Sequence, residues 1–341
     1  MNVEILKKPD AACETFIAQR PDAKICHLPA WGAMVTEATR HKQFYLVARN
    51  GGKVCGVLPL AHIRSFLFGN HMISEGFSTY GGILADGQQA RDALFEFSVE
   101  LAKQYNCESI EFRSIEPLPY NLDLRTGKMS MYLRLNPDPE VIWKALDAKV
   151  RNQVRKAEKS GITVIDGGIE LLDDFYPIYS IRMHQLGTPA YPRKLMLGIL
   201  REFPDYARIF VARLDRLTVG AGFVVCYNGF VEIPWAATLV EYNRLCPNNL
   251  LYWTIIKHFS LAGAKCFDFG RCSTGGGTHQ FKEQWGTEPV ELHYQYWVPP
   301  GKQLTILSPD NPKYQKKAEM WKKLPFFMAR ILGPYISRNL A

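Results

Sequence analysis

The stretch FDFGRCSTGGGTHQFKEQWG, residues 267–286, combines a short strand, a glycine-rich loop and a lysine between aromatic residues. Side chains alternate along a strand, so we expect Phe267 and Phe269 on a core face and Asp268 on the other. Three glycines, Gly275 to Gly277, open backbone conformations that a hinge or a close ligand contact would use. The segment 281–286 then holds the Lys282 ammonium beside two rings, where it can face developing negative charge on a substrate. The alternative is an aromatic edge of the core with a solvated lysine.

The strand in this stretch ends a pattern that occurs twice in the chain. Residues 44–50 (FYLVARN), a Gly51-Gly52 turn and residues 54–61 predict a β-hairpin. Residues 209–214 (IFVARL) and 218–226 repeat it, with Arg213 lying 164 positions after Arg49. A helix over about 91–105 leads into SIEFR (109–113), as a helix over 249–262 leads into CFDFG (266–270), an offset of 157 positions. The matching order predicts an internal duplication of an α/β (α+β) unit and therefore two related domains.

Composition indicates a folded protein with an excess of positive charge, most of which can be solvated surface charge. The 341 residues suffice for two domains, 47% are hydrophobic and 22% charged, and the net charge of +8 favours nucleic acid, phosphorylated metabolites or an acidic membrane surface. The eight cysteines form no C-x-x-C pair, so we expect neither a metal site nor a disulfide framework. Neither an apolar signal region near the start nor an uninterrupted apolar run of about 18 residues is found. We therefore expect a cytoplasmic protein that spans no membrane.

A strongly basic helix is predicted between the two halves. Asp138 is suited to cap its start, and Ser160-Gly161 to end it. Its apolar positions recur at steps of three and four and predict a stripe for the core, formed by Trp143, Leu146, Val150, Val154 and Ala157. From residue 144 to residue 159 six basic residues stand against two acidic ones, a net charge of +4 that includes Arg151 and Arg155. Such guanidinium groups can hold a pyrophosphate or an RNA backbone, and a solvated helix face is the alternative.

These features predict an N-terminal domain over 1–137 and a second domain over 138–300 that begins with the basic helix. A C-terminal tail over 301–341 is rich in basic and aromatic residues, namely Lys316, Lys317, Trp321, Lys322, Lys323, Phe326, Phe327 and Arg330. Packing of this tail on the body is the interpretation we favour. The alternative is peripheral contact with the anionic inner face of a membrane.

Seven motifs are spread over nearly the whole chain, namely HLPAWG (27–32), YGG (80–82), KVRNQVRKAEKSG (149–161), LGTP (186–189), NNLLYW (248–253), FDFGR (267–271) and FKEQWG (281–286). Taken together, they resemble the FemAB family. Within that family the chain most resembles the branch found with exosortase-linked (PEP-CTERM) exopolysaccharide clusters of Gram-negative bacteria. The resemblance implies two tandem GNAT-like acyltransferase domains, in agreement with the duplication, and the formation of an amide bond.

The resemblance also implies site residues. In the family's pattern Phe281 and Lys282 lie near the acyl-transfer centre, and a basic helix with Arg151 and Arg155 helps to hold a phosphorylated acceptor. Further substrate-binding residues are expected within the matching motifs, at Lys149, Asn152, Arg271, Tyr80 and Trp31. Lys282 can stabilise the oxyanion that forms when an amine attacks an ester or thioester. Asp268 is the candidate general base, although Glu111 occupies its place in the first repeat, which favours a structural carboxylate.

The donor stays open between aminoacyl-tRNA and acyl-CoA. RLCPNN (244–249) stands where acetyltransferases carry the Q/R-x-x-G-x-G/A loop for the coenzyme A pyrophosphate, and we find no long coiled-coil insertion. We expect no tightly bound cofactor, no metal and no DNA, and tRNA is a candidate partner. The predicted acceptor is an amino group on a phosphorylated glycan or peptidoglycan-type precursor in cell-envelope biogenesis. The alternatives are a non-catalytic binder of RNA or another anionic polymer, and a scaffold on a degenerate acyltransferase fold.

Overall fold

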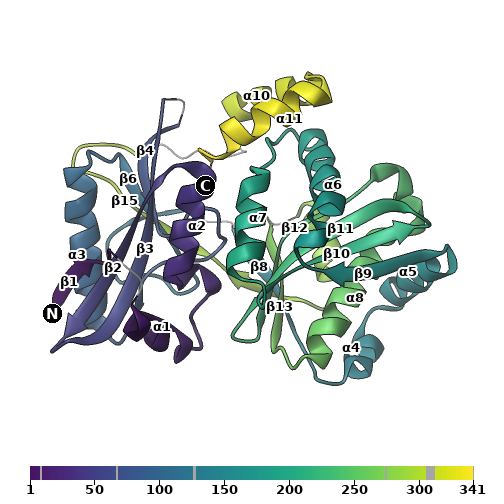
Figure 1. The fold of residues 1–341 in the computed structure, drawn as a ribbon, viewed down its shortest axis with the longest axis horizontal. Coiled ribbons are helices and arrows are strands. Elements are labelled where there is room, and N and C mark those ends of the chain that lie inside the picture. Colours follow the sequence, from purple (N-terminus) through teal and green to yellow (C-terminus); the bar gives the residue numbers. More distant parts are fainter. Residues whose placement is uncertain (8–9, 67, 126–127, 273–274, 305–311, 341) are drawn as a thin grey trace. The chain divides into compact units, whose positions relative to one another are not determined.

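The computed structural model describes residues 1–7, 10–66, 68–125, 128–272, 275–304 and 312–340, and the chain divides into two compact units. The first unit consists of Met1–Lys128, Glu291–Ser308 and Arg338–Ala341. The second consists of Met129–Val290 and Pro309–Ser337. Each unit contains one mixed sheet with helices packed against it (Figure 1).

The sheet of the first unit is built around the first predicted hairpin. Its order is β1 (Asn2–Ile5), β2 (Lys42–Asn50), β3 (Lys53–Ser65), β4 (Gly69–Ile73), β6 (Ser109–Ser114), β15 (His293–Trp297) and β7 (Asp123–Arg125), with β5 (Leu84–Ala85) beside β3. Its helices are α1 (Ala11–Ala18), the 3-10 helix η1 (Ile25–His27), α2 (Pro29–Thr39) and α3 (Gln88–Gln104). The hairpin is confirmed, because Gly51 and Gly52 have φ values of 55° and 86°, as two-residue hairpin turns require.

The sheet of the second unit contains the second predicted hairpin, β10 and β11. Its order is β14 (Glu288–Glu291), β8 (Met129–Arg134), β13 (Cys266–Cys272), β12 (Phe230–Thr238), β11 (Leu217–Tyr227), β10 (Ala207–Leu214) and β9 (Ile162–Gly167). The α-helices are α4 (Pro139–Ala145), α5 (Ala148–Lys159), α6 (Leu172–Gln185), α7 (Arg193–Glu202), α8 (Pro247–Leu261), α9 (Gly277–Glu283), α10 (Pro312–Lys323) and α11 (Phe326–Ser337). The 3-10 helices are η2 (Ile169–Leu171) and η3 (Val240–Leu245).

The predicted duplication is present in the structure. In the first unit β2, β3 and β4 pair antiparallel, α3 follows, and β6 then pairs parallel to β4. In the second unit β10, β11 and β12 pair antiparallel, α8 follows, and β13 pairs parallel to β12. The parallel step is three residue pairs long in both units. The fold is therefore a mixed α/β fold of two related halves.

The two units exchange a strand along the chain. β8 follows β7 in sequence, yet β7 lies in the first sheet and β8 in the second, between β13 and β14. In the same way β15 follows β14, yet it lies in the first sheet, between β6 and β7. The division of the structure therefore differs from the sequence-based boundaries at 137/138 and 300/301, since residues 129–134 contribute to the second sheet and residues 293–297 to the first.

The basic segment forms two helices, so the prediction of a single helix over 138–160 is wrong. The carboxylate of Asp138 accepts the N–H of Glu140 at 2.9 Å, as expected for a cap, but α4 ends at Ala145. Leu146 is extended, and Asp147 starts α5 by accepting the N–H of Lys149 at 2.7 Å. An acidic cap inside the segment thus restarts the helix. The predicted apolar stripe is buried, apart from the half-buried Trp143.

The C-terminal helices α10 and α11 pack on α6 of the second unit, as predicted for the tail (Figure 1). The Ser337 hydroxyl donates to the carbonyl of Ala190 at 2.7 Å. A ring nitrogen of His184 lies 3.0 Å from the carbonyl oxygen of Leu324. Within the described part of the chain, every helix is too short or too polar to cross a membrane.

Candidate active site

The parallel ladder between β12 and β13 covers only the first three residues of each strand. It pairs Phe230, Val231 and Glu232 with Cys266, Phe267 and Asp268, after which both strands continue without pairing to each other. Gly270 has a φ of 79° and lies at an irregularity in the ladder between β13 and β8. This left-handed conformation favours glycine. We call this region, where the carbonyl groups of β13 can meet other donors, the open end of the β12–β13 ladder.

The Lys282 side chain occupies this open end. It extends from α9, is 4% exposed, and its Nζ donates to the carbonyls of Gly270 and, at 3.0 Å, Arg271. An ammonium has three N–H donors, and the described residues provide no acceptor for the third and no carboxylate in an ion pair. Burial lowers the pKa of Lys282, Arg271 adds to that shift, and Cys272 and Asp268 oppose it. A buried charge without a counter-ion is costly for folding, which points to a functional role.

The glycine-rich loop places α9 next to the strand. Gly275 has a φ of 80°, Gly276 is the N-cap of α9 and Gly277 is its first residue. Two of the three glycines therefore belong to the helix start, while Ser273 and Thr274 of the predicted loop lie outside the described residues.

Asp268 fixes the bend at Gly270. It is 1% exposed, and its Oδ1 accepts the N–H of Gly270 at 2.8 Å and the hydroxyl of Ser130 on β8. Because Lys282 binds the carbonyl of the same glycine, Asp268 positions an acceptor of the ammonium. Both faces of β13 are buried, since Phe267 is 0% exposed, so the carboxylate does not mark a solvent face. The role of Asp268 as a general base stays a prediction.

Four aromatic rings hold α9 against β13. Tyr252 of α8 stacks on Phe269, with 5.2 Å between ring centroids, and meets Phe281 edge-on at 5.3 Å. Trp285 is 1% exposed and lies 6.2 Å from Phe281. Burial, and then the charge of Asp268, raise the pKa of Tyr252, so its phenol stays protonated at neutral pH. The sequence pointed to Phe281 but assigned no role to Tyr252, whose only signal is its place in the NNLLYW motif.

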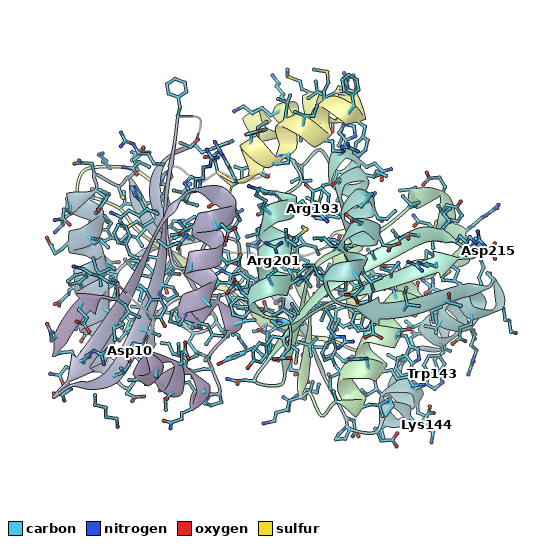
Figure 2. All side chains as sticks on the ribbon, viewed as in Figure 1. Asp10, Trp143, Lys144, Arg193, Arg201 and Asp215 are labelled. Carbon is cyan, nitrogen blue, oxygen red and sulfur yellow. The ribbon has the colours of Figure 1, made fainter. Side chains whose placement is uncertain are left out.

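Arg151 and Arg155 both make structural contacts. The Arg151 guanidinium donates to carbonyls at the end of α4, those of Leu146 and, at 3.2 Å, Lys144. Arg155 lies over the ring of Trp143, 5.4 Å from its centroid. Figure 2 labels Trp143 and Lys144 on α4. The sequence pattern suggests that a ligand explains why two arginines stand four residues apart. Helix capping by Arg151 and stacking of Arg155 on Trp143 explain part of this pattern without a ligand.

The remaining predicted residues of the second unit are exposed. Lys149 and Asn152 lie on α5, the helix that carries Arg151 and Arg155, and Arg271 follows Gly270 on β13. The side chain of Asn249, near the start of α8, donates to Gln153 of α5 at 3.1 Å. The structure thus gathers Lys282, Phe281, Asp268 and Arg271 around β13, and it gathers the other predicted residues of this unit on α5.

Trp31 and Tyr80 are buried in the first unit. Trp31 is 4% exposed and its side chain lies against Glu75, a carboxyl whose pKa is raised by burial. Tyr80 is 2% exposed, and the Nζ of Lys24 lies 5.5 Å from its ring centroid. Their predicted role in substrate binding stays a prediction.

His27 and Tyr80 line a cavity of about 280 Å³ in the first unit. The Nδ1 of His27 accepts the backbone N–H of Lys24 at 3.0 Å, and the ring is 3% exposed. Burial lowers the pKa of His27 to about 4, so the imidazole is neutral at physiological pH. This histidine therefore holds the turn before α2 together.

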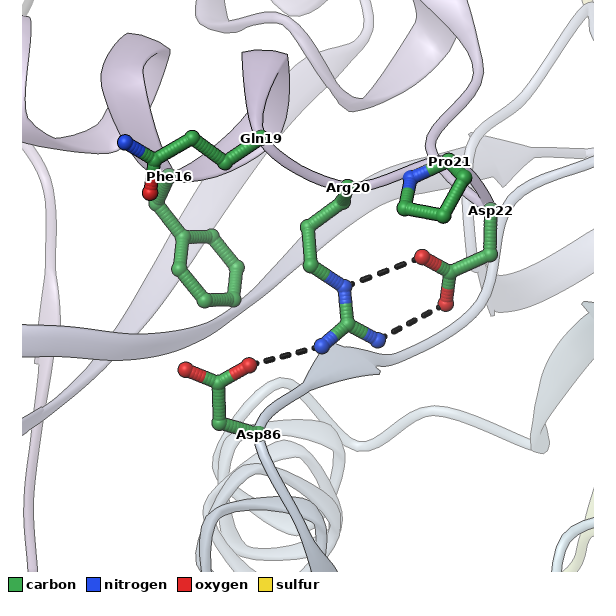
Figure 3. A pocket seen from close by; sticks show the side chains of 6 residues that line it. All are labelled: Phe16, Gln19, Arg20, Pro21, Asp22 and Asp86. Carbon is green, nitrogen blue, oxygen red and sulfur yellow. Dashed lines mark hydrogen bonds and ion pairs between the residues drawn. The ribbon is translucent and has the colours of Figure 1, made fainter.

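Ion pairs line a second depression of the first unit. The Arg20 guanidinium binds Asp22 through two nitrogens, at 2.9 and 2.8 Å, and Asp86 through the third at 2.6 Å (Figure 3). Its cation is therefore neutralised by residues of the chain itself.

The segment that contains the open ladder matches a known family. Residues 145–283 match the model described as an acetyltransferase (GNAT) domain, and this match ends one residue after Lys282. The matched segment contains β12, β13, α8 and the Lys282 site. Compared with the curated proteins, the sequence has no match.

Several solved structures share the fold of most of the chain. FemX has a TM-score of 0.69 at 15% identity, with 86% of this chain and 97% of FemX covered. The C-terminal domain of a putative lysylphosphatidylglycerol synthetase from Agrobacterium fabrum has a TM-score of 0.56 at 13% identity, covering 83% and 90%. A tandem GNAT protein from the clavulanic acid biosynthesis pathway has a TM-score of 0.53 at 13% identity, covering 89% and 99%. The chain therefore has a FemAB-like fold of tandem GNAT-like domains.

Proposed function

We propose that the chain is an N-acyltransferase of FemAB type. It would join an activated acyl or aminoacyl donor to an amino group on a phosphorylated glycan or peptidoglycan-type precursor of the cell envelope, at the cytoplasmic face of the membrane. The observation that carries the proposal is the buried Lys282 ammonium in the open end of the β12–β13 ladder, within the segment that matches the GNAT model. The FemX-like fold and the exposed basic residues of α5 support it.

The reaction uses the free N–H of that ammonium. The acceptor nitrogen attacks the acyl carbonyl, a C–N bond forms, and the carbonyl oxygen becomes an oxyanion. When this intermediate collapses, the C–O or C–S bond to the donor breaks, and the proton lost by the amine ends on the leaving group or in water. Lys282 donates its third N–H to the oxyanion while Gly270 and Arg271 hold the other two. A positioned donor of this kind lowers such a barrier by about 3 kcal/mol.

The start of α8 differs from the phosphate-binding loop of acetyltransferases. In place of a glycine-rich loop, Cys246 adopts a left-handed conformation with a φ of 59°, and Pro247 is the first helical residue. Proline has no N–H, so the helix offers one backbone donor fewer to a pyrophosphate than a glycine loop would. Acyl-CoA and aminoacyl-tRNA are both donors to be tested.

The test offers the purified chain a panel of acyl-CoAs and aminoacyl-tRNAs with amino-bearing envelope precursors and detects amide products by mass spectrometry. For the active pair, Lys282→Met should lower kcat about 100-fold to 1,000-fold, because it removes the charge and keeps the side-chain length. Lys282→Arg should retain more activity. Lys257→Met, which changes an exposed lysine on α8, is the matched control and should behave like the unchanged chain. Undiminished turnover by folded Lys282→Met protein would exclude the proposed role.

A non-catalytic binder of RNA or another anionic polymer is the second candidate. The exposed Lys149, Lys156 and Lys159 on α5 favour it. Such binding weakens steeply with salt, because phosphate contacts release counterions. RNA affinity that falls with salt and with Lys149→Ala, together with no transfer from any donor, would favour this candidate over the enzyme.

A further inference from the structure

α11 turns its small residues inward and its large apolar residues outward. Ala329, Gly333 and Ser337 are buried, and a Cβ on Gly333 would lie 3.4 Å from the backbone nitrogen of Ala190. Five large side chains on the other side are exposed, namely Phe327 (67%), Met328 (38%), Ile331 (60%), Leu332 (41%) and Tyr335 (63%). These positions recur every three to four residues and form one stripe. A helix on the surface of a globular protein normally buries such a stripe, whereas α11 exposes it.

α10, which precedes α11 in the chain, adds one exposed apolar residue. Met320 is 70% exposed, and we call it and the five α11 residues the apolar face of α10–α11. The other large apolar residues that are exposed in the described chain are scattered over separate elements, as Val240 and Leu261 are. Contiguous apolar surface of this kind marks an interaction site, whereas isolated exposed residues do not.

Exposed basic residues lie on the same two helices as the apolar face. Lys316, Lys317, Lys322 and Lys323 of α10 and Arg330 of α11 are exposed. Glu319 is the one acidic residue in the sequence of the two helices, and it pairs with Lys322 at 2.6 Å. The surface therefore combines apolar side chains with an excess of positive charge, which fits an anionic lipid surface better than a neutral one.

We propose that the apolar face of α10–α11 seats the chain on a bilayer that contains anionic phospholipid. The apolar side chains enter the boundary between headgroups and acyl chains, and the lysines and Arg330 meet the lipid phosphates. The 12 residues of α11 are about 18 Å long, too short for the roughly 30 Å hydrocarbon core, so the helix lies in the interface. This inference goes beyond the proposed reaction and does not depend on it.

The test measures binding of the full chain to sedimented vesicles of phosphatidylcholine, with and without phosphatidylglycerol. The chain should bind the anionic vesicles, bind neutral ones weakly, and be released by salt. Ile331→Glu should lower the partition coefficient at least about tenfold, because it places a carboxylate among the apolar residues. The double variant Lys316→Glu/Lys323→Glu should lower it by a similar factor on anionic vesicles only.

Leu261→Glu is the matched control, since Leu261 is an equally exposed apolar residue (64%) on α8, and it should bind like the unchanged chain. Ile331 is exposed, so its variant should keep the thermal unfolding temperature, which is measured in parallel. Equal vesicle binding by Ile331→Glu and the unchanged chain, or no binding to anionic vesicles, would overturn the proposal. A dimer in light scattering that Ile331→Glu dissociates would assign the face to a second copy and overturn it as well.

Discussion

His27 should make the first unit lose stability in mild acid. Its pKa is about 4 in the folded chain, against an ordinary value of 6.5, because burial disfavours the charged ring. Between these values the unfolded chain binds a proton that the folded chain does not, so stability is complete above pH 6.5 and falls as the pH drops towards 4. The 2.5-unit difference corresponds to about 3 kcal/mol in total, of which about 2 kcal/mol is lost by pH 5.

The assay compares hydrogen exchange in β2 and β3 at about pH 7.5 and pH 5, by mass spectrometry and corrected for intrinsic rates. In His27→Asn the amide oxygen can still accept the N–H of Lys24, but the side chain does not titrate. The variant should therefore lose about 2 kcal/mol less than the unchanged chain over this range. His184→Asn, in the second unit, is the matched control and should leave exchange in β2 and β3 unchanged. If His27→Asn and the unchanged chain show the same pH dependence, the reasoning is refuted.

Three further predictions concern other sites. The pKa of Lys282 is lowered from 10.5, so the ammonium loses its proton at a pH below 10.5 and the rate of transfer should fall there. In a pH profile of kcat/KM, Lys282→Arg should move this fall to higher pH. Gly81→Ala should lower the free energy of unfolding by about 3 kcal/mol, because the new Cβ would lie 2.0 Å from the carbonyl oxygen of Ser74. Gly277 has open space around it, so Gly277→Ala is the control and should leave the stability measured by urea unfolding unchanged. Arg151→Ala should lower the same free energy by about 1–2 kcal/mol, because the last carbonyls of α4 lose a donor, and an unchanged urea midpoint would contradict the capping role.

The sequence predicts the parts of the fold that depend on local patterns. Both hairpins, α3, α8 and the two strands that follow them appear where alternation and turn residues place them. The exchange of β8 and β15 cannot be predicted in this way, because the side-chain pattern of a strand does not determine which sheet the strand joins. The prediction of a single basic helix is wrong at Asp147. The apolar stripe continues past this residue, but its carboxylate caps a new helix.

The candidate site was predictable to a similar extent. A lysine between aromatic residues indicated Lys282, but its carbonyl partners on β13 depend on the end of the β12–β13 ladder, which is a tertiary feature. The contacts of Arg151 with the end of α4 could not be predicted from the sequence either, because they require the break between the helices at Leu146. Local sequence patterns therefore indicate candidate residues, whereas the partners of each side chain depend on tertiary structure.

The exchanged strands bear on how the polypeptide can be divided. A chain cut at 137/138 would leave the N-terminal piece without the strand between β6 and β7, and the C-terminal piece without the one between β13 and β14. Each fragment would carry an orphan strand that completes the other, so the separated pieces should aggregate alone and reassemble when coexpressed. A substitution that destabilises one half should accordingly lower the stability of the other, because each half contributes a strand to the other's sheet.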